Sequence, residues 1–501
     1  MQEQTLLQTF LNEQADKNAF VAHQIDSFND FVSRRLQRTI NEIGKVTVEL
    51  SSGEFLDIKF GTVNLGKPII REANGSTRSI LPQEARLRNL TYSSPLLVEM
   101  TPVFEGKAQE TEVVEIGEIP IMIKSVLCPL STMNKGELVL AGEDIKDPGG
   151  YFIINGTERV VVLLEEVAPN KLILQKDGEE FFARINSERS GYVQRHVFER
   201  KSNGVIVAKF ANIVNTPIPI VALMKALGME TDKEIIENII TDNESELEET
   251  YTNIYEVEAC TRDEAIDYIG RRMKVMQKEH RETRVLQLLD TYLLGHIGQR
   301  VEDRKKKAKF LAIIMRKLIH VKHGTLTVDD IDHYANKRLK GVGDLFEDLL
   351  RSIILGRWGL VARLQYNYQK MMKRGRKFLK LQGVVVSDVL TKQIMRSMAT
   401  GNWITGKTGV SQRLERSNFI RTTEHLRSVV SALSSTQEHF EARELHATHM
   451  GRLCCIRTPE GQNIGLRNFL AMGAKLTQPA TDADNLKILT TIKALGAKTD
   501  G

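Results

Sequence analysis

Four residues that could bind a metal or act as nucleophiles fall within ten positions: His446, His449, Cys454 and Cys455. Histidine nitrogens and cysteine thiolates are usual zinc ligands, but the sulfur ligands of a zinc site are normally spaced two to four residues apart. Adjacent cysteines point away from each other, and free cysteines mostly behave as small buried hydrophobic residues. Nucleophilic catalysis by Cys454 would need an orienting third group, which the sequence does not reveal. We therefore expect no metal here, and keep a metal hydrolase using His446, His449 and Cys454 as the enzymatic alternative.

Three carboxylates in "VDDIDHY", Asp329, Asp330 and Asp332, form the other candidate for metal chemistry. Two-metal catalysis needs clustered carboxylates to hold magnesium. The spacing is more typical of a helix start with Thr327 as N-cap, because acidic side chains complement the exposed N–H groups there. The chain also has no P-loop and no GxGxxG motif after a strand. We predict no catalytic residue and no cofactor bound by this chain.

Charge is distributed unevenly along the chain. The 501 residues contain 69 Lys or Arg and 64 Asp or Glu, a net charge of +5. Residues 334–427 contain 19 Lys or Arg and 6 Asp or Glu, a balance of +13, so the remainder balances to −8. A basic segment in a nearly neutral protein favours a polyanion bound on one face. A solvated helical face is the other interpretation.

Composition and the patterns of known targeting segments exclude several classes of protein. Hydrophobic residues make up 41% of the chain, which is typical of globular proteins. No run approaches the roughly 18 apolar residues of a membrane helix, and the N-terminus lacks the pattern of a signal peptide. The four cysteines form no CxxC pair, so we expect no disulfide framework, no membrane association and a cytoplasmic location.

The pattern of apolar residues divides the chain into regions of different predicted secondary structure. Apolar residues at helical spacing predict an amphipathic helix over 20–43. Short β-branched runs predict an antiparallel β region over 46–165, in which Asn155-Gly156 is a strong hairpin signal because both residues tolerate positive φ. The chain turns helical after about residue 204, stays helical and basic over 344–400, and is dominated by loops from 401 onward.

Arginines continue beyond the basic helices into the loop-rich region. "KRGRK" at 373–377 lies near Tyr366 and Tyr368, and Arg396, Arg413, Arg416, Arg421 and Arg427 follow downstream. Arginines dispersed over tens of residues of folded chain can line a groove that follows a phosphate backbone. Each one alone is more often a surface charge, but as a set they predict contact with nucleic acid.

Two long blocks carry a family resemblance. "GNWITGKTGVSQRLERSNFIRTTEHLR" and "ARELHATHMGRLCCIRTPEGQNIGLRNFL" resemble the fork region of the second-largest subunit of multisubunit DNA-dependent RNA polymerase. Upstream blocks match in the same order: "VAHQIDSFNDFV", "LPQEARLRNLTYSSPLLVEM", "IGEIPIMIKSVLCPL", "DPGGYFIINGTERVVV" and "DIDHYANKRL". The length resembles the N-terminal half called B″, which occurs in archaeal polymerases that make this subunit as two chains.

The resemblance implies a multidomain α+β fold. It implies a β-rich protrusion with helices over 20–203 and 339–395, a mostly helical lobe over 204–338, a loop-rich fork over 396–475 and a tail over 476–501. It also implies a non-catalytic role inside a nucleotidyltransferase, whose catalytic magnesium is expected on the largest subunit. The implied partners are the companion C-terminal half, called B′, the largest and other polymerase subunits, template and non-template DNA, and nascent RNA.

The matched motifs also imply which residues line the wall of the cleft beside the RNA–DNA hybrid. Together with the arginines above, the predicted nucleic-acid-binding residues are Arg396, Gln412, Arg413, Arg416, Arg421, Arg427, Glu460, Gln462, Asn463 and Arg467. This sequence departs from the family at Arg457, which replaces a usually acidic residue, and at Gln462, which replaces a proline common in bacterial relatives. A stand-alone nucleic-acid-binding protein that uses residues 334–427 alone is the alternative function.

Overall fold

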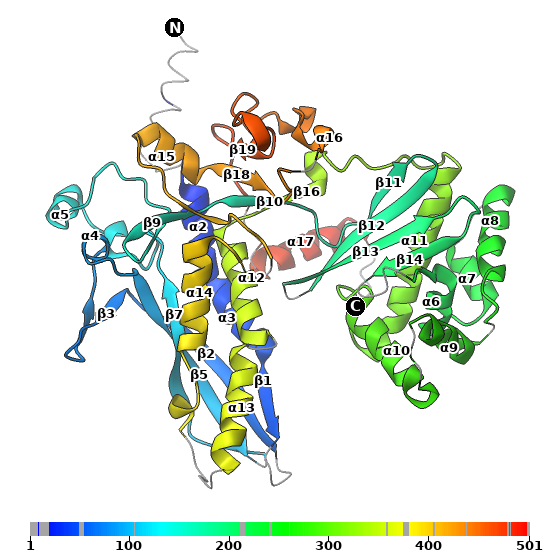
Figure 1. The fold of residues 1–501 in the computed structure, drawn as a ribbon, viewed down its shortest axis with the longest axis horizontal. Helices are drawn as coiled ribbons and strands as arrows, with labels where there is room; N and C mark the ends of the chain where they lie inside the picture. Colours follow the sequence, from blue (N-terminus) through cyan, green and yellow to red (C-terminus); the bar gives the residue numbers. More distant parts are fainter. Residues whose placement is uncertain are drawn as a thin grey trace. The chain divides into compact units, whose positions relative to one another are not determined.

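The computed structural model forms two compact units, which are described separately (Figure 1). Unit 1 contains residues 1–164 and 339–501, and unit 2 contains residues 165–338. The structure describes residues 9, 20–49, 55–104, 106–189, 191–210, 216–239, 243–259, 261–273, 275, 277–356, 359–373, 380–403, 406–436, 438–477, 480 and 482–497. Helices mix with several small, mainly antiparallel sheets, as an α+β fold requires.

Unit 1 begins with the helix that the spacing of apolar residues predicted. It runs through α2 (Ala22–Asp30), a π-helical turn η1 (Phe31–Arg35) and α3 (Leu36–Ile43). Its apolar stripe packs into the core, where Phe28, Leu36 and Ile40 are at most 2% exposed. The helical prediction for residues 20–43 is confirmed.

A long antiparallel sheet follows this helix. Its strand order is β1-β2-β5-β6, and β7 also pairs with β5, on the edge away from β2. The strands are β1 (Lys45–Glu49), β2 (Phe55–Leu65), β5 (Ser93–Phe104), β6 (Lys107–Ala108) and β7 (Glu112–Pro120). Smaller elements between and after them are β3 (Ile69–Arg71), β4 (Thr77–Ser79), α4 (Pro82–Leu87), η2 (Pro129–Ser131) and α5 (Lys135–Leu140). Figure 1 shows α13 (Leu360–Lys373) and α14 (Asp388–Thr400) running beside this sheet.

The Asn155-Gly156 hairpin is also confirmed. It joins β8 (Phe152–Ile154) to β9 (Thr157–Val161), with Ile154 paired to Thr157. Asn155 has φ 48° and Gly156 has φ 72°, so both central residues adopt the left-handed conformation of a type I′ turn. The other edge of β9 pairs with β17 (Ser411–Arg413), which connects the hairpin to the predicted fork.

Three helices from the second half of unit 1 close its core. They are α12 (Val342–Leu355), α13 (Leu360–Lys373) and α14 (Asp388–Thr400), with a 3-10 turn η5 (Leu381–Gly383) before the last. Phe28 and Phe152 contact Phe346 of α12, with ring centroids 6.0 and 5.3 Å away. The ring of Trp403 lies edge-on to Phe346 and its indole N–H donates to the Leu345 carbonyl over 2.9 Å. Segments more than 300 residues apart therefore share one core.

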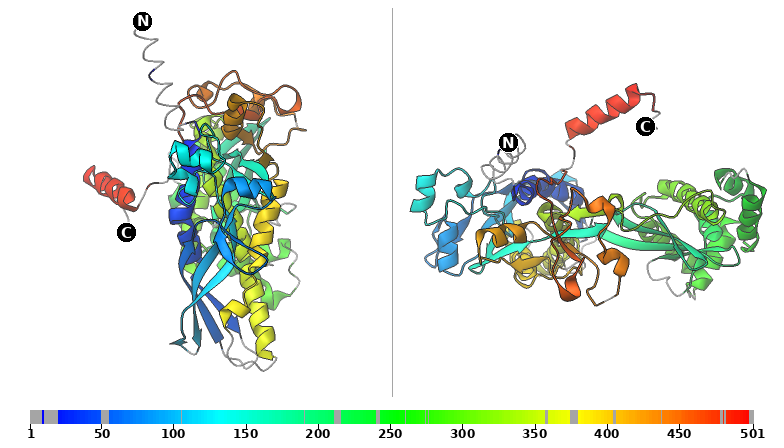
Figure 2. Two further views of the ribbon diagram at one scale, coloured as in Figure 1. Left: turned by 90° about the vertical axis from the view of Figure 1, so that its left-hand side faces the viewer. Right: turned by 90° about the horizontal axis from the view of Figure 1, so that it is seen from above.

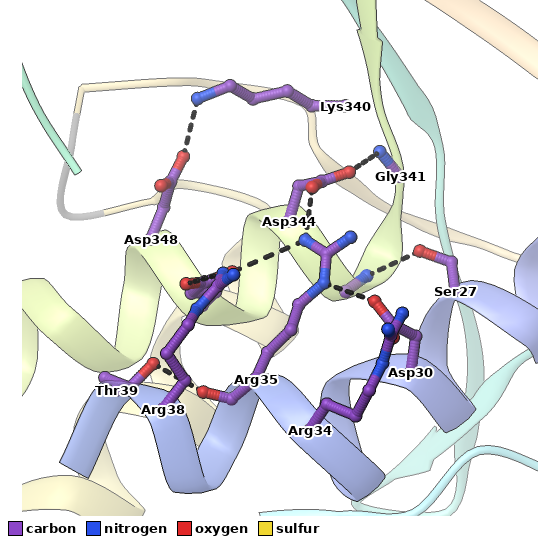
Figure 3. Close-up of polar contacts among 12 residues, drawn as sticks. Ser27, Asp30, Arg34, Arg35, Arg38, Thr39, Lys340, Gly341, Asp344 and Asp348 are labelled. Carbon is purple, nitrogen blue, oxygen red and sulfur yellow. Dashed lines mark hydrogen bonds and ion pairs between the residues drawn. The ribbon is translucent and has the colours of Figure 1, made fainter. Parts of the chain in front are cut away.

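A buried network of ion pairs joins the first helix to α12 (Figure 3). Arg35 contacts Asp30 over 2.5 Å on its own helix and reaches Asp344 on α12. Glu347, which is 7% exposed, accepts hydrogen bonds from Arg38 over 2.7 Å and from Arg351 over 2.6 Å. Buried charges are tolerated only when paired and hydrogen-bonded, so this network fixes the position of α12 against the first helix.

The end of unit 1 consists of short elements and loops, as predicted from residue 401 onward. These elements, which Figure 2 shows gathered at one end of unit 1, are α15 (Phe419–Leu426), β18 (Ser428–Ser431), α16 (Phe440–Arg443), η6 (Ala447–His449), η7 (Gly461–Asn463) and β19 (Arg467–Phe469). Strand β18 pairs with β19 in antiparallel register. A last helix, α17 (Asp482–Ala494), follows.

Unit 2 is a five-stranded antiparallel sheet covered by helices. The strands, in spatial order, are β11 (Ile173–Asp177), β12 (Glu180–Arg189), β13 (Tyr192–Arg200), β14 (Ile206–Phe210) and β15 (Ile218–Pro219). The helices are α6 (Ile220–Ala226), α7 (Asp232–Ile239), α8 (Glu244–Tyr255), α9 (Arg262–Arg272), α10 (Lys278–Tyr292), η3 (Val301–Asp303), α11 (Arg304–Lys322) and η4 (Tyr334–Asn336). The chain passes between the units in β10 (Leu163–Val167) and β16 (Lys337–Lys340).

The compact units and the predicted domains share one boundary and differ at the other. Both divide the chain between residues 338 and 339, but unit 2 begins at residue 165 whereas the predicted lobe begins at 204. The difference arises because β11 to β13 pair in continuous register with β14, so that Phe198 lies opposite Ala208 in one sheet. The assignment of protrusion, lobe and fork stays a prediction.

The predicted helix start at Thr327 is wrong. Residues 327–333 are extended or bent, and the next long helix is α12, whose N-terminal Gly341 N–H donates to the Asp344 side chain over 2.9 Å. The carboxylates have other partners: Asp329 accepts from the Leu174 N–H over 2.9 Å, and Asp332 pairs with Lys337 over 3.1 Å. Asp329 is therefore bound by a residue distant in the sequence and Asp332 by a nearby lysine, so neither carboxylate caps a helix.

Candidate nucleic-acid interface

Gln412 on β17 is the centre of a hydrogen-bond network in the predicted fork. The Glu415 N–H donates to Nδ1 of His425 over 3.3 Å, so the neutral ring carries its proton on Nε2 and donates it to Gln412 Oε1 over 3.1 Å. Arg467 on β19 donates to the same oxygen, and Gln412 Nε2 donates to the Gly409 carbonyl over 2.9 Å. Two predicted residues, Gln412 and Arg467, are therefore in direct contact.

Burial controls the protonation of this network. Burial, together with the positive charge of Arg467, lowers the pKa of His425 to about 4. Burial likewise lowers the pKa of Arg467. His425 is therefore neutral at pH 7, which is the form that can accept from a backbone N–H and donate to an amide oxygen at once.

Two of the predicted arginines form ion pairs with carboxylates of the same chain. Arg416 contacts Glu158 over 2.6 Å and Asp147 over 2.7 Å, and its guanidinium lies 4.8 Å from the centre of the Tyr151 ring. Arg421 contacts Glu415, and Glu424 lies 3.6 Å away. Their charges are largely balanced within the chain.

Arg427 is buried and links three segments of the backbone. It is 8% exposed and donates to three carbonyl groups, those of Phe20 over 2.8 Å, Leu470 over 3.3 Å and Ala471 over 2.7 Å. The adjacent Leu426 carbonyl accepts from Gln24 of α2 over 2.9 Å. Arg427 thus fixes the start of β18 to the first helix and to the segment after β19.

The loop from Thr458 to Leu466 presents three predicted residues on a rigid backbone. Glu460, Gln462 and Asn463 are all exposed. Arg443 holds the loop by donating to the Gln462 carbonyl over 2.7 Å and to the Ile464 carbonyl over 3.0 Å. At Gly465, φ is 72° and a Cβ would lie 2.2 Å from the Arg443 carbonyl oxygen, so no larger residue fits. Glycine at position 465 therefore shapes this loop.

Arg396 and Arg413 differ from the other predicted arginines. Both are exposed, Arg396 on α14 and Arg413 on β17. Within the described ranges neither guanidinium takes part in a hydrogen bond or an ion pair. They are the predicted arginines most available to an external anion.

Most other cations of the basic segment 334–427 have internal partners. Lys340 and Lys407 pair with Asp348 over 2.9 and 3.6 Å, and Arg351 pairs with Glu347. Most of the "KRGRK" run, residues 374–377, lies outside the described residues. The excess positive charge therefore does not form a continuous unpaired stripe among the described residues.

The histidines and cysteines of the His446–Cys455 stretch brace a loop. His446 Nδ1 accepts from the Thr448 N–H over 3.1 Å, and the Cys454 N–H donates to the Phe469 carbonyl over 2.8 Å. Cys455 is exposed and its Sγ lies 3.0 Å from the sulfur of Met450. The described residues contain no group of three or more His, Cys, Asp or Glu placed to share a metal ion.

Sequence reasoning missed His425 and Arg159. His425 lies in the "EHLR" motif, but its role depends on the pairing of β17 with β9 and on the fold of β19 over it. Arg159 lies in the "GTERVVV" block, directly opposite Arg413. The hairpin signal at Asn155-Gly156 locates Arg159 on a strand, but nothing local identifies the strand that pairs with it.

Comparison with known proteins gives a consistent result. Residues 19–392 match the family model described as RNA polymerase beta subunit, and residues 412–476 match RNA polymerase Rpb2, domain 3. The chain is 43% identical to the DNA-directed RNA polymerase subunit Rpo2N of Methanocaldococcus jannaschii, over 96% of this chain and 97% of that protein. It is 39% identical to Rpo2N of Methanococcus vannielii, with full coverage of both chains.

A longer relative matches over part of its length. The chain is 42% identical to the DNA-directed RNA polymerase subunit Rpo2 of Saccharolobus solfataricus, over 91% of this chain but 40% of that protein. Among the described helices, none has the length and apolar character needed to cross a lipid bilayer.

Proposed function

Because this chain belongs to the family of RNA polymerase β subunits, we propose that it acts as a non-catalytic wall of the DNA cleft in DNA-directed RNA polymerase. In this proposal the fork contacts the RNA–DNA hybrid and downstream DNA through phosphate and polar contacts that carry no sequence information. The observation that supports it best is the loop from Thr458 to Leu466, which holds Glu460, Gln462 and Asn463 exposed on a braced backbone.

The proposed partners follow from the relatives. The companion is a C-terminal half of the same subunit, because the matched relatives include proteins named Rpo2N and a longer Rpo2 of which this chain spans 40%. The largest subunit and the other polymerase subunits complete the enzyme and supply the catalytic magnesium. Nascent RNA and both DNA strands are the proposed ligands.

The roles of the predicted residues divide into two groups. Arg396, Arg413, Glu460, Gln462 and Asn463 are exposed and are proposed to contact nucleic acid directly.

The second group is proposed to position the first. Gln412 and Arg467 fix β17 against β19, while Arg416, Arg421 and Arg427 are held by partners within the chain. Substitutions in this group should affect nucleic-acid contact through the shape of the fork.

Site-specific photocrosslinking tests the proposal. A benzophenone amino acid placed at Gln462 in the assembled polymerase should crosslink to labelled transcript or template in an active elongation complex. The same group at Asn64, an exposed residue of β2, serves as the control and should give no comparable crosslink. An active elongation complex without crosslinks at positions 413, 460, 462 and 463 would refute the proposal.

The alternative of a stand-alone nucleic-acid-binding protein is supported by the +13 balance of residues 334–427. The internal pairing of Lys340, Arg351, Lys407, Arg416 and Arg421 counts against it. A chain expressed alone that is monomeric and binds DNA tightly, with no gain from the companion half, would favour this alternative.

A further inference from the structure

Arg159 and Arg413 face each other across two paired strands. Strand β17 pairs with β9 so that Arg413 lies opposite Arg159, and Gln412 lies opposite Val160. Residues directly opposite each other in an antiparallel pair point to the same face, with Cβ atoms about 4.5–5.5 Å apart. The two guanidinium groups therefore emerge from neighbouring points on one face of this sheet.

The carboxylate next to Arg159 in the sequence points the other way. Glu158 is adjacent to Arg159 in β9, and successive side chains of a strand point to opposite faces. On that opposite side Glu158 contacts Arg86 over 2.9 Å and Arg416 over 2.6 Å. Glu415, two residues after Arg413, contacts Arg421. Strand alternation thus turns Glu158 away from Arg159, and Glu415 is occupied by its ion pair with Arg421.

Neither arginine has an alternative partner in the part of the chain that the structure describes. No hydrogen bond or ion pair of either guanidinium is present there. Burial lowers the pKa of Arg159, and the positive charge of Arg413 lowers it further. Like charges directly opposite each other destabilise a sheet, so the fold itself gains nothing from placing these two side chains together.

The pair suits a phosphate group. A guanidinium presents several N–H donors in a planar fork that matches two oxygens of a phosphate. Both arginines project from strands rather than free loops, and β9 is fixed by its hairpin with β8 on one edge and by β17 on the other. Their positions are therefore set before a ligand arrives, which lowers the entropy lost on binding.

We propose that Arg159 and Arg413 together bind one backbone phosphate of the nucleic acid held by the polymerase. This inference rests on the proposed function and adds Arg159, which lies more than 200 residues before the predicted fork. The contact involves no base, so it is independent of sequence. The same chemistry could bind a phosphate of the incoming nucleoside triphosphate, and the experiment separates the two sources.

The test uses polymerase assembled with Arg159→Gln, Arg413→Gln or both. The control is Arg284→Gln on α10, an exposed arginine for which the described residues likewise offer no hydrogen bond or ion pair. The measurement is the lifetime of elongation complexes as a function of KCl concentration. Each single variant should dissociate roughly tenfold faster, as expected for loss of a charge-assisted hydrogen bond.

The double variant gives the more specific signature. Because both arginines contact the same phosphate, the double variant should dissociate less than hundredfold faster, and so be less than additive. Its slope of log lifetime against log salt should fall by about 0.7–0.9, the change expected for one phosphate contact. The Arg284→Gln polymerase should match the wild type in both quantities.

Three outcomes would overturn the inference. The first is a double variant whose elongation complexes keep the lifetime and the salt slope of the wild type. If the fork of that variant still crosslinked to nucleic acid, only this inference would fall and the proposed function would stand. A raised KM for nucleoside triphosphates with unchanged lifetimes would assign the pair to the substrate. Faster dissociation with a melting temperature below that of the wild type would indicate a structural role, since removing a like-charge pair should leave that temperature unchanged or raise it.

Discussion

Removing the Glu347 carboxylate should release α12 from the first helix. Glu347 is 7% exposed, and its two oxygens accept from Arg351 over 2.6 Å, Arg38 over 2.7 Å and Arg35 over 3.4 Å. Breaking a buried ion pair by deleting one partner costs about 3–5 kcal/mol, because the remaining charges stay buried. Arg35 and Arg351 keep Asp344 and Glu42 as partners, so we expect Glu347→Ala to cost about 3 kcal/mol, at the lower end of this range.

Hydrogen exchange in the assembled polymerase measures this cost locally. A loss of about 3 kcal/mol corresponds to exchange more than about a hundredfold faster at amides of α3 and α12 that open through this contact. Lys392→Ala is the control, because Lys392 and Asp388 form an ion pair in which both side chains are more than half exposed and such pairs contribute little. Equal protection in Glu347→Ala and Lys392→Ala would refute the reasoning.

The same carboxylate should make the network sensitive to acid. Burial alone would raise the pKa of Glu347, but the hydrogen bonds and positive charges of Arg351 and Arg38 together outweigh burial and lower the pKa below its ordinary value. A carboxyl group with a lowered folded-state pKa stabilises the fold above its unfolded pKa of about 4.5, and that contribution is lost as pH falls through the folded value. The difference in protection between wild type and Glu347→Ala should therefore shrink only below about pH 4.5.

Three further predictions concern the fork. Gly465→Ala should expose residues 458–466 to protease and weaken crosslinking from position 462, because its Cβ would lie 2.2 Å from a backbone oxygen. The control is Gly461→Ala, where φ is 79° but a Cβ would meet no atom within 4 Å. This variant should lose only about 1–2 kcal/mol of stability and keep the crosslink. The pKa of His425 in the folded chain is lowered from 6.5 to about 4, so the neutral ring should stabilise the fold fully above pH 6.5. This contribution, roughly 3 kcal/mol in all, should be lost as the pH falls towards 4. Urea midpoints of the wild type should therefore fall more between pH 7.5 and 5 than those of His425→Gln, and parallel curves would contradict this. Arg457 contacts Glu424 over 3.0 Å. In a double-mutant cycle of melting temperatures, Arg457→Glu should destabilise the fold more alone than when it is combined with Glu424→Arg, with a coupling free energy of about 0.2–1 kcal/mol. Strictly additive effects would exclude the pairing.

Local patterns predicted the elements whose stabilising contacts are local. The helix over residues 20–43 has an apolar stripe that any core would bury, and the Asn155-Gly156 turn needs only the φ values of its own two residues. The start at Thr327 failed because Asp329 is bound by the Leu174 N–H, 155 residues away. The compact unit begins at residue 165, before the predicted boundary at 204, because strand pairing continues across residue 204.

The partners of each arginine depend on which face of a strand its side chain lies on and on residues distant in the sequence. Their family motifs indicated the fork, but Arg416 and Arg427 are held by Glu158 and by the Phe20 carbonyl, both hundreds of residues earlier in the chain. Once the hairpin is placed, alternation along β9 already implies that Glu158 and Arg159 point to opposite faces. The pairing of β17 with β9 brings a second arginine to the face opposite Glu158. A residue's availability to nucleic acid is thus decided less by its own motif than by which face the neighbouring acids occupy.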